Sequence, residues 1–535
     1  MEVSVARLPE HPNFDHLKKQ AKDLLRDYHA GDAGGFERFR ASLPAAAGKP
    51  DAEIAAMDLK LHDAQSCLAR EYGFPSWTNL KNYVDLRNNV LLNNRANAIP
   101  VWLNVVYGHH YDRPHPEQAV KILEEHSELI QGDFLLSCAV GDDALVRAAI
   151  ARNPAIVHRT FDAWKCPCCD WVGYAMPPLV AVTHSGLLRL ERFRDGLHRT
   201  ARVLLDAGTD PNQSTRTADD EPLSALYGAA GKNHDAALTR LLLDAGANPN
   251  DNESLYHSRE TRDLTIARML LDAGAVVEGT NALLRQLDFD DMEGLRLMLA
   301  HTRDVNDTSR GNETALLHSL RRRRSPEHVR ALLDKGADPH ARATDGTTAY
   351  RLALQFGLTE AAAMLSAAGA AESLSLEDQF LAACARGDAA EARRFVEAQP
   401  GIIRGMSDHT LQLLPELAAA RNGAAVRVMV DLGWPIAVRG GGWDASALNQ
   451  AVFNGDAGLT RFLLERGASW TEPHGFGDNV HGTLSFASRN HEASEGDWVG
   501  CAQALVDHGL PVEQLDGDYS DDVADVFRRA RVKRV

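Results

Sequence analysis

The chain has 535 residues, with 57 Lys and Arg against 74 Asp and Glu, which gives a formal net charge of −17. This balance argues against a nucleic-acid-binding protein, because phosphates are recognised by basic surfaces. No stretch reaches the ~18 consecutive apolar residues of a membrane-spanning helix and no signal peptide opens the chain, so we expect a cytoplasmic protein that has no membrane partner.

Residues 1–115 are predicted to form an N-terminal helical segment. Phe14, Leu17, Ala21 and Leu24 recur at the three- and four-residue spacing of an amphipathic helix. A second helix is predicted upstream of the stop signal Gly73-Phe74-Pro75. This part of the chain does not share the periodicity that follows it.

Residues 116–515 are predicted to be an array of about eleven repeated units with a period of about 33 residues. Each unit contains an apolar helix that ends in Gly, as in Leu241-Leu242-Leu243-Asp244-Ala245-Gly246. A turn follows, and then a second helix that opens near Thr, Ser or Pro. The helix-ending glycines are at positions 208, 246, 274, 336, 369, 433, 467 and 509. Such a Gly suits the left-handed backbone after a helix, and stacked units would share one continuous core.

The segment Asp345-Gly346-Thr347-Thr348-Ala349-Tyr350 resembles the turn and first helix of the ankyrin-repeat family. Thr348 stands where the family has Pro. The N-terminal segment resembles that of many bacterial ankyrin-repeat proteins, which implies a bacterial origin. The resemblance implies an all-α ankyrin-repeat solenoid with short turn fingers, preceded by a small helical N-terminal domain. It also implies a concave groove that holds another protein without a cofactor.

An insertion over residues 161–178 interrupts the period and contains Cys166, Cys168 and Cys169. Closely spaced thiolates suit zinc or copper, but a structural zinc site needs four ligands. We therefore favour free thiols over a metal site here. The isolated cysteines, Cys67, Cys138, Cys384 and Cys501, lie inside apolar helical patterns, which is typical of a reducing compartment.

A second insertion is predicted over residues 470–498. His474, Asp478, His481 and Arg489 would give it general acid–base chemistry if their side chains converged. The alternative is a glycine-rich finger turn whose polar residues are solvated, and we favour this alternative because loop spacing does not fix geometry.

Large aromatic residues flank the turns and insertions in the last part of the array: Trp434, Trp443, Trp470, Phe476 and Trp498. Rigid aromatic side chains dominate the energetics of protein interfaces, so these are candidate partner-binding residues. An equally good interpretation is that they close irregular joints of the stack.

Residues 516–535 are predicted to form a C-terminal cap or tail. Arg321-Arg322-Arg323-Arg324 is interpreted as a solvated edge.

The function predicted from these features is a scaffold that binds a partner protein through the concave groove and the finger loops. The alternative is an enzyme or small-molecule-binding protein whose site is built from the insertions at 161–178 and 470–498. No motif nominates a reaction, a cofactor or the partner's identity.

Overall fold

The computed structural model describes residues 8–9, 12–57, 59–74, 77, 80–81, 83–84, 87–88, 95–108, 114–164, 173, 175–216, 221–308, 313–490, 496–512 and 519–533. The described chain is mostly helical, with a few very short strands. This agrees with the all-α class expected from the sequence.

The N-terminal bundle consists of short helices that pack through the predicted apolar stripe. Leu17, Ala21 and Leu24 are buried on α1, which packs against α4. The elements are α1 (Phe14–His29), α2 (Ala33–Ser42), η1 (Pro44–Ala46), α3 (Asp51–Ala55) and α4 (Leu61–Glu71). Next come α6 (Arg95–Tyr107), α7 (Pro116–Glu125) and η2 (Ser127–Ile130).

From α8 onward the helices form successive pairs, each made of a first and a second helix. The earlier pairs are α8 (Phe134–Val140) with α9 (Asp143–Arg152) and η3 (Pro154–His158); α10 (Pro178–Thr183) and η4 (Gly186–Arg189) with α11 (Glu191–Asp206); α12 (Ala225–Tyr227) and η5 (Gly228–Lys232) with α13 (Ala236–Asp244); α14 (Ser254–His257) and η6 (Ser258–Glu260) with α15 (Thr265–Asp272); and α16 (Ala282–Asp288) with α17 (Met292–His301).

The later pairs continue the same pattern to the end of the array. They are α18 (Ala315–Arg321) with α19 (Pro326–Asp334); α20 (Ala349–Gln355) with α21 (Thr359–Ala367); α22 (Leu376–Ala385) with α23 (Ala389–Ala398); η7 (Ile403–Gly405), α24 (Asp408–Leu411) and α25 (Leu413–Ala419) with α26 (Gly423–Asp431); α27 (Ala447–Phe453) with α28 (Ala457–Glu465); and α29 (Val480–Asn490) with α30 (Trp498–Asp507). The last helix is α31 (Asp521–Lys533).

The glycines that end the second helices have the predicted backbone conformation. All eight have a φ between 87° and 99°, in the left-handed region. An Asn in the turn after several of the second helices links its unit to the next. Asn212, Asn250 and Asn306 each accept a hydrogen bond from a backbone N–H of the following unit, at 2.7, 2.8 and 2.8 Å. The repeated phrase therefore ends each helix and also fixes the stacking of neighbours.

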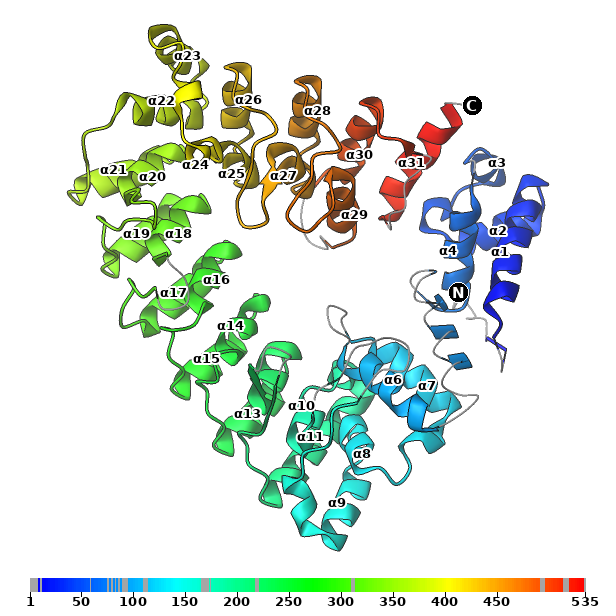
Figure 1. Cartoon of the computed structure of the whole chain (residues 1–535). Coiled ribbons are helices and arrows are strands. Elements are labelled where there is room, and N and C mark those ends of the chain that lie inside the picture. Colours follow the sequence, from blue (N-terminus) through cyan, green and yellow to red (C-terminus); the bar gives the residue numbers. More distant parts are fainter. Residues whose placement is uncertain are drawn as a thin grey trace.

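The helix pairs follow an arc, as Figure 1 shows. First helices such as α14, α18, α20, α25 and α27 line the inner side of the arc, and second helices such as α15, α19, α26 and α28 line its outer side. First helices pack on first helices of the adjacent pairs, and most second helices do the same. We call the side lined by the first helices the inner surface.

Short hairpins, which we call fingers, connect some of the pairs. In one finger β1 (Ser214–Arg216) pairs antiparallel with β2 (Pro222–Ser224), with Thr215 opposite Leu223. In another β3 (Arg439–Gly440) pairs antiparallel with β4 (Ala445–Ser446). The bridges Arg342–Thr348 and Pro473–Asn479 close two further fingers.

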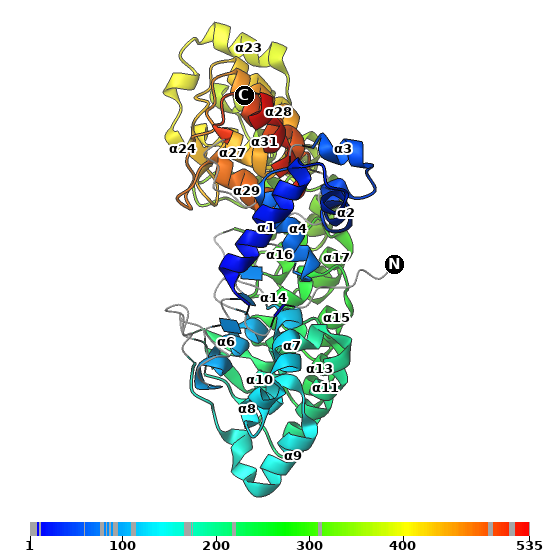
Figure 2. The ribbon, with the colours of Figure 1, turned by 90° about the vertical axis from the view of Figure 1, so that its right-hand side faces the viewer.

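The two ends of the chain meet and close the arc (Figures 1 and 2). Arg528 on α31 forms an ion pair with Asp63 on α4, and the side chains of both are almost fully buried, at 4% and 3% exposed. On the opposite side of the bundle, Lys121 of α7 lies 4.2 Å from the centre of the Phe74 ring. The N-terminal bundle thus bridges the first and last parts of the array.

The segment 470–498, predicted to be an inserted loop, is largely regular. It contains the finger around residues 473–479 and the first helix α29. Val480, Leu484 and Ala487 are buried on α29, which packs on α27. Their four- and three-residue spacing is the helical pattern that the glycine-rich context obscured.

Candidate binding surface

Five aromatic side chains gather near the end of the array, on two adjacent fingers and the two first helices that follow them. We call Trp443, Phe453, His474, Phe476 and Phe486 the aromatic cluster. Trp443 stacks on Phe476 with ring centres 6.5 Å apart, and Phe453 stacks on Phe486 at the same separation. Trp443 also lies 5.5 Å from Phe453. Phe476 is 80% exposed and Phe486 is 55% exposed.

The cluster is built from equivalent positions in two successive units. Trp443 and Phe476 are 33 residues apart, and so are Phe453 and Phe486. A backbone hydrogen bond from Gly475 N to the carbonyl oxygen of Trp443, 3.0 Å long, ties the two fingers together. A Cβ at position 475 would lie 2.9 Å from that oxygen, so this approach requires Gly. The repeat itself therefore places four rings as two stacked pairs.

His474 supports the finger from beneath. It is buried, its ring lies 5.3 Å from that of Trp443, and its Nδ1 accepts a hydrogen bond from the backbone N–H of Phe476 at 3.3 Å. Burial lowers the pKa of His474, although Asp478 opposes the shift. This contact adds to the backbone hydrogen bonds of the turn that presents Phe476, from His474 N to the Asp478 carbonyl oxygen at 2.9 Å and from Gly477 N to the His474 carbonyl oxygen at 3.1 Å.

The four residues considered for acid–base chemistry do not form one group. Among the described residues, no hydrogen bond joins Asp478 to either imidazole. Asp478 accepts from the backbone N–H of Asn479 at 2.8 Å, and His481 packs on Tyr519 at 5.6 Å. Arg489 donates to the carbonyl oxygen of Ser485 in its own helix. The structure therefore gives these side chains separate local contacts.

The remaining tryptophans lie outside the cluster. Trp434 is 3% exposed, donates to the carbonyl oxygen of Leu411 at 3.0 Å, and stacks on Phe380. Trp470 and Trp498 are partly buried against the core. We therefore leave these three out of the binding surface. Phe453 and Phe486 were not singled out from the sequence, although their 33-residue separation was a signal for them.

A polar pocket with a volume of about 260 Å³ lies on the inner surface beside the aromatic cluster, between α18, α20, α22, α24 and α25. Its floor is apolar and buried, and consists of Leu352, Phe356, Leu381 and Leu413. Charged and polar side chains form the rim. The helix α25 that closes one side of the pocket packs against α27, which carries Phe453 of the cluster. The two features are therefore neighbours on one surface.

Several rim charges of the polar pocket are paired with other protein groups. Arg351 donates two hydrogen bonds to Asp378 Oδ1, at 2.9 and 2.6 Å. His409 contacts Asp345 at 2.6 Å. Arg321 contacts Glu313 at 2.6 Å, outside the pocket lining.

Glu416 is an exception on this rim, because the negative charge of its carboxylate is only weakly balanced by a nearby cation. Among the described residues its side chain has one ionic contact, with Arg321 Nη1 at 3.5 Å. Burial raises the pKa of Glu416, and Arg321 only partly offsets this effect. The pocket therefore contains an acceptor that the fold does not saturate.

Other titratable groups on the inner surface are matched across neighbouring elements. Burial disfavours the charged form of His257, but hydrogen bonds to Glu253 and Glu260, at 3.1 and 2.8 Å, outweigh it and raise the pKa of His257 to about 9. His318 lies between Asp288 and Glu313, at 2.9 and 3.6 Å. His257 is thus held within its own unit, whereas His318 also contacts Asp288 of the preceding unit.

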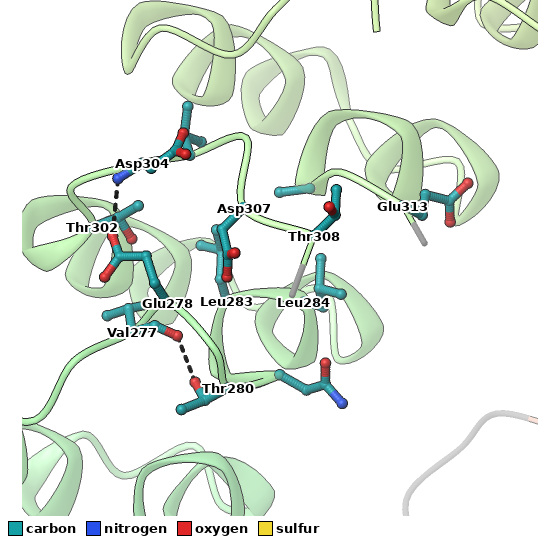
Figure 3. A pocket seen from close by; sticks show the side chains of 13 residues that line it. Val277, Glu278, Thr280, Leu283, Leu284, Thr302, Asp304, Asp307, Thr308 and Glu313 are labelled. Carbon is teal, nitrogen blue, oxygen red and sulfur yellow. Dashed lines mark hydrogen bonds between the residues drawn. The ribbon is translucent and has the colours of Figure 1, made fainter. Parts of the chain in front are cut away.

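A smaller pocket lies between two fingers in the middle of the array, and Figure 3 shows its lining. Its volume is about 20 Å³, enough for about one water molecule. Its acidic side chains brace the backbone: Glu278 accepts from the backbone N–H groups of Arg303 and Asp304, and Asp307 accepts from that of Gly279 at 2.8 Å. This pocket is a product of turn geometry.

Cysteine chemistry has little support in the described part of the chain. Cys67, Cys138, Cys384 and Cys501 are buried and free, as their apolar contexts predicted, and burial raises the pKa of Cys67, Cys384 and Cys501 to about 12. The cluster Cys166, Cys168 and Cys169 lies outside the described residues. Within those residues, no three His, Cys, Asp or Glu side chains are grouped as a metal ion requires.

The comparisons with known proteins are sparse. No family model and no curated protein sequence matches the chain. Among solved structures, an ankyrin repeat domain from Acinetobacter baumannii AYE is 24% identical and covers 36% of this chain and 97% of its own length, with a TM-score of 0.30. Likeness at this level says nothing about function.

No described helix is both long and apolar enough to cross a bilayer.

Proposed function

We propose that this chain is an interaction scaffold of the ankyrin-repeat type, and that it holds a partner protein on its inner surface at the aromatic cluster. The observation that carries the proposal is the exposure of Phe476 and Phe486, each stacked on a ring of the adjacent unit. Contiguous exposed apolar surface marks interaction sites, and rigid aromatic rings are the side chains that dominate interface energetics.

Local architecture supports this assignment. The cluster is tied by the Gly475–Trp443 backbone hydrogen bond and braced by the buried His474, so little conformational freedom is lost when a partner covers it. Phe289, at the end of α16, is also exposed, at 43%, but it lies outside the aromatic cluster. Its ring lies over the Arg285 guanidinium, at 4.6 Å, and it provides a matched control.

The test uses a photo-crosslinking amino acid placed at position 476, with position 289 as the control, in cells that express the full chain. We expect position 476 to capture one protein in stoichiometric amounts and position 289 to capture none. With that protein purified, Phe476→Ala and Trp443→Ala should each weaken its affinity by about 10- to 30-fold, whereas Phe289→Ala leaves it unchanged. Equal affinities for all three variants and the parent would refute the proposal.

A further inference from the structure

The polar pocket combines an apolar floor with a rim that has four carboxylates and two guanidinium groups. Leu352, Phe356, Leu381 and Leu413 make the floor. A guest that fits this arrangement has an apolar stem and a head group rich in N–H donors.

The rim has spare acceptors because its cations are already engaged. Arg351 is committed to Asp378, and Arg321 is committed more closely to Glu313, at 2.6 Å, than to Glu416, at 3.5 Å. The carboxylate of Glu377 accepts only a long hydrogen bond, 3.4 Å, from Thr410 among the described residues.

Gln355 adds a further polar group to the same lining. Its side-chain amide makes no hydrogen bond within the described part of the chain, although it is half-buried at the edge of the pocket. Two carboxylates and one amide oxygen therefore face a cavity with an apolar base, and a cationic guest would neutralise the charge that burial disfavours on Glu416.

We propose that the polar pocket receives an arginine side chain of the partner protein. This inference rests on the proposed function, and it names the chemistry by which the partner is recognised. The guanidinium group presents five N–H donors in a plane and can contact Glu416, Glu377 and Gln355 together, while its methylene stem lies over the apolar floor.

Size and position favour a side chain as the guest. The volume of about 260 Å³ is below the ~300 Å³ at which small-molecule pockets usually begin. The pocket is lined by first helices, and one of them, α25, is in direct contact with α27 of the aromatic cluster. A single extended segment of the partner could therefore place an apolar residue on Phe476 and an arginine in the pocket.

The experiment is saturation-transfer difference NMR on the full chain, with Nα-acetyl-arginine amide as the probe and Nα-acetyl-citrulline amide as its uncharged isostere. We expect saturation of the arginine methylenes and binding at least tenfold weaker for citrulline. Glu416→Gln should weaken the arginine probe by about tenfold, because a charge-assisted hydrogen bond becomes a neutral one. Glu360→Gln, at an exposed position on α21, is the matched control and should have no effect.

A second variant tests the pocket independently, in case Glu416→Gln does not fold. Gln355→Lys puts a cation into the pocket and should abolish binding of the probe, with an unchanged circular dichroism spectrum. Equal binding of arginine and citrulline, or full binding by Glu416→Gln and Gln355→Lys, would overturn the proposal. Free arginine binding tenfold or more tightly than the capped probe would identify a small molecule as the guest and also overturn it.

Failure here and failure of the proposed function are distinguishable. The probe assay involves no partner protein and no residue of the aromatic cluster. A negative probe assay together with a partner that still depends on Phe476 removes the arginine pocket and leaves the scaffold. A positive probe assay with no crosslinked partner removes the scaffold and, with it, the partner as the source of the arginine.

Discussion

Two of the arginine–carboxylate pairs that join separate elements differ in burial: the pair at the closure between α31 and α4 and the pair in the polar pocket on the inner surface. At the closure, the side chains of Arg528 and Asp63 are 4% and 3% exposed, and the pair joins residues 465 positions apart. In the pocket, the side chains of Arg321 and Glu416 are 29% and 25% exposed, and their contact is 3.5 Å long. A guanidinium–carboxylate pair is thus buried in one place and partly exposed to solvent in the other.

Burial decides what such an ion pair contributes to the fold. In a fully buried pair, both groups have lost their hydration. Removing one group leaves the other as an uncompensated buried charge and lowers the free energy of unfolding by several kcal/mol. A loosely paired carboxylate beside a cavity contributes little to folding and is available to a ligand. The closure is thus a structural contact, whereas the pocket keeps a partly exposed carboxylate with one long ionic contact.

The largest expected effect is at the closure. Arg528→Ala leaves the buried Asp63 carboxylate without its arginine, with His62 at 3.5 Å as the remaining ionic contact, so we expect a loss of about 3–5 kcal/mol from the contact that joins the two ends. Urea unfolding should shift to lower concentration, and small-angle X-ray scattering should show a larger radius of gyration. The double variant Asp63→Asn with Arg528→Met should recover most of the loss. An unchanged single variant would show that the ends are held by other contacts.

Within the pocket, Arg351 should behave as an intermediate case. Its partner Asp378 is almost buried but keeps hydrogen bonds from Ser375, at 3.0 and 2.7 Å. Arg351→Ala removes two charge-assisted hydrogen bonds, and we expect a loss of about 2 kcal/mol in urea unfolding. Arg351→Lys, which keeps the charge and loses the paired geometry, should lie between the two. If Arg351→Ala lost as much free energy of unfolding as Arg528→Ala, the ion pairs of the pocket and of the closure would contribute equally to folding.

The pH dependence of stability sharpens the comparison on the inner surface. The pKa of His257 is raised from 6.5 to about 9, so its stabilising contribution is fully present below pH 6.5 and is lost as the pH rises through about 9. Urea midpoints measured from pH 6 to 10 should therefore fall more in the parent than in His257→Gln. Parallel curves for the two proteins would mean that the contacts with Glu253 and Glu260 do not hold the proton.

The smallest expected effect is at Glu416, and its sign is opposite to that at the closure. The pKa of Glu416 is raised, so ionisation above its unfolded-state pKa of about 4.5 disfavours the folded state. At pH 7 we expect Glu416→Gln to leave stability unchanged or to increase it by up to about 1 kcal/mol. Thermal unfolding at pH 7 and pH 4 measures this, and the gain should disappear at pH 4. A clear loss at pH 7 would make Glu416 a structural residue.

Local sequence signals predicted the helix endings well. The positive φ of Gly246 and its equivalents follows from the chemistry of one position, which the repeated phrase displays. Of the aromatic residues, Trp443 and Phe476 were singled out because they flank turns. Phe453 was missed, because a single apolar residue at the end of a helix looks like core. Only the comparison of units at a separation of 33 residues reveals its stacked partner Phe486.

Long-range features were beyond such reasoning. The pairing of Asp63 with Arg528 depends on the curvature that accumulates over the whole array, and no local pattern encodes it. The polar pocket likewise depends on which carboxylates are already paired in three dimensions. Burial of Trp434, in contrast, follows the repeat, because residues after other helix-ending glycines, such as Ala337 and Leu510, are also buried.

The most direct test of the central claim is hydrogen–deuterium exchange of the full chain with and without the crosslinked partner. We predict that the partner protects the fingers around residues 439–446 and 473–479 and the first helices α27 and α29, while exchange in the second helices α26 and α28 is unchanged. Protection confined to the second helices, on the outer side of the arc, would contradict the assignment of the inner surface as the binding surface.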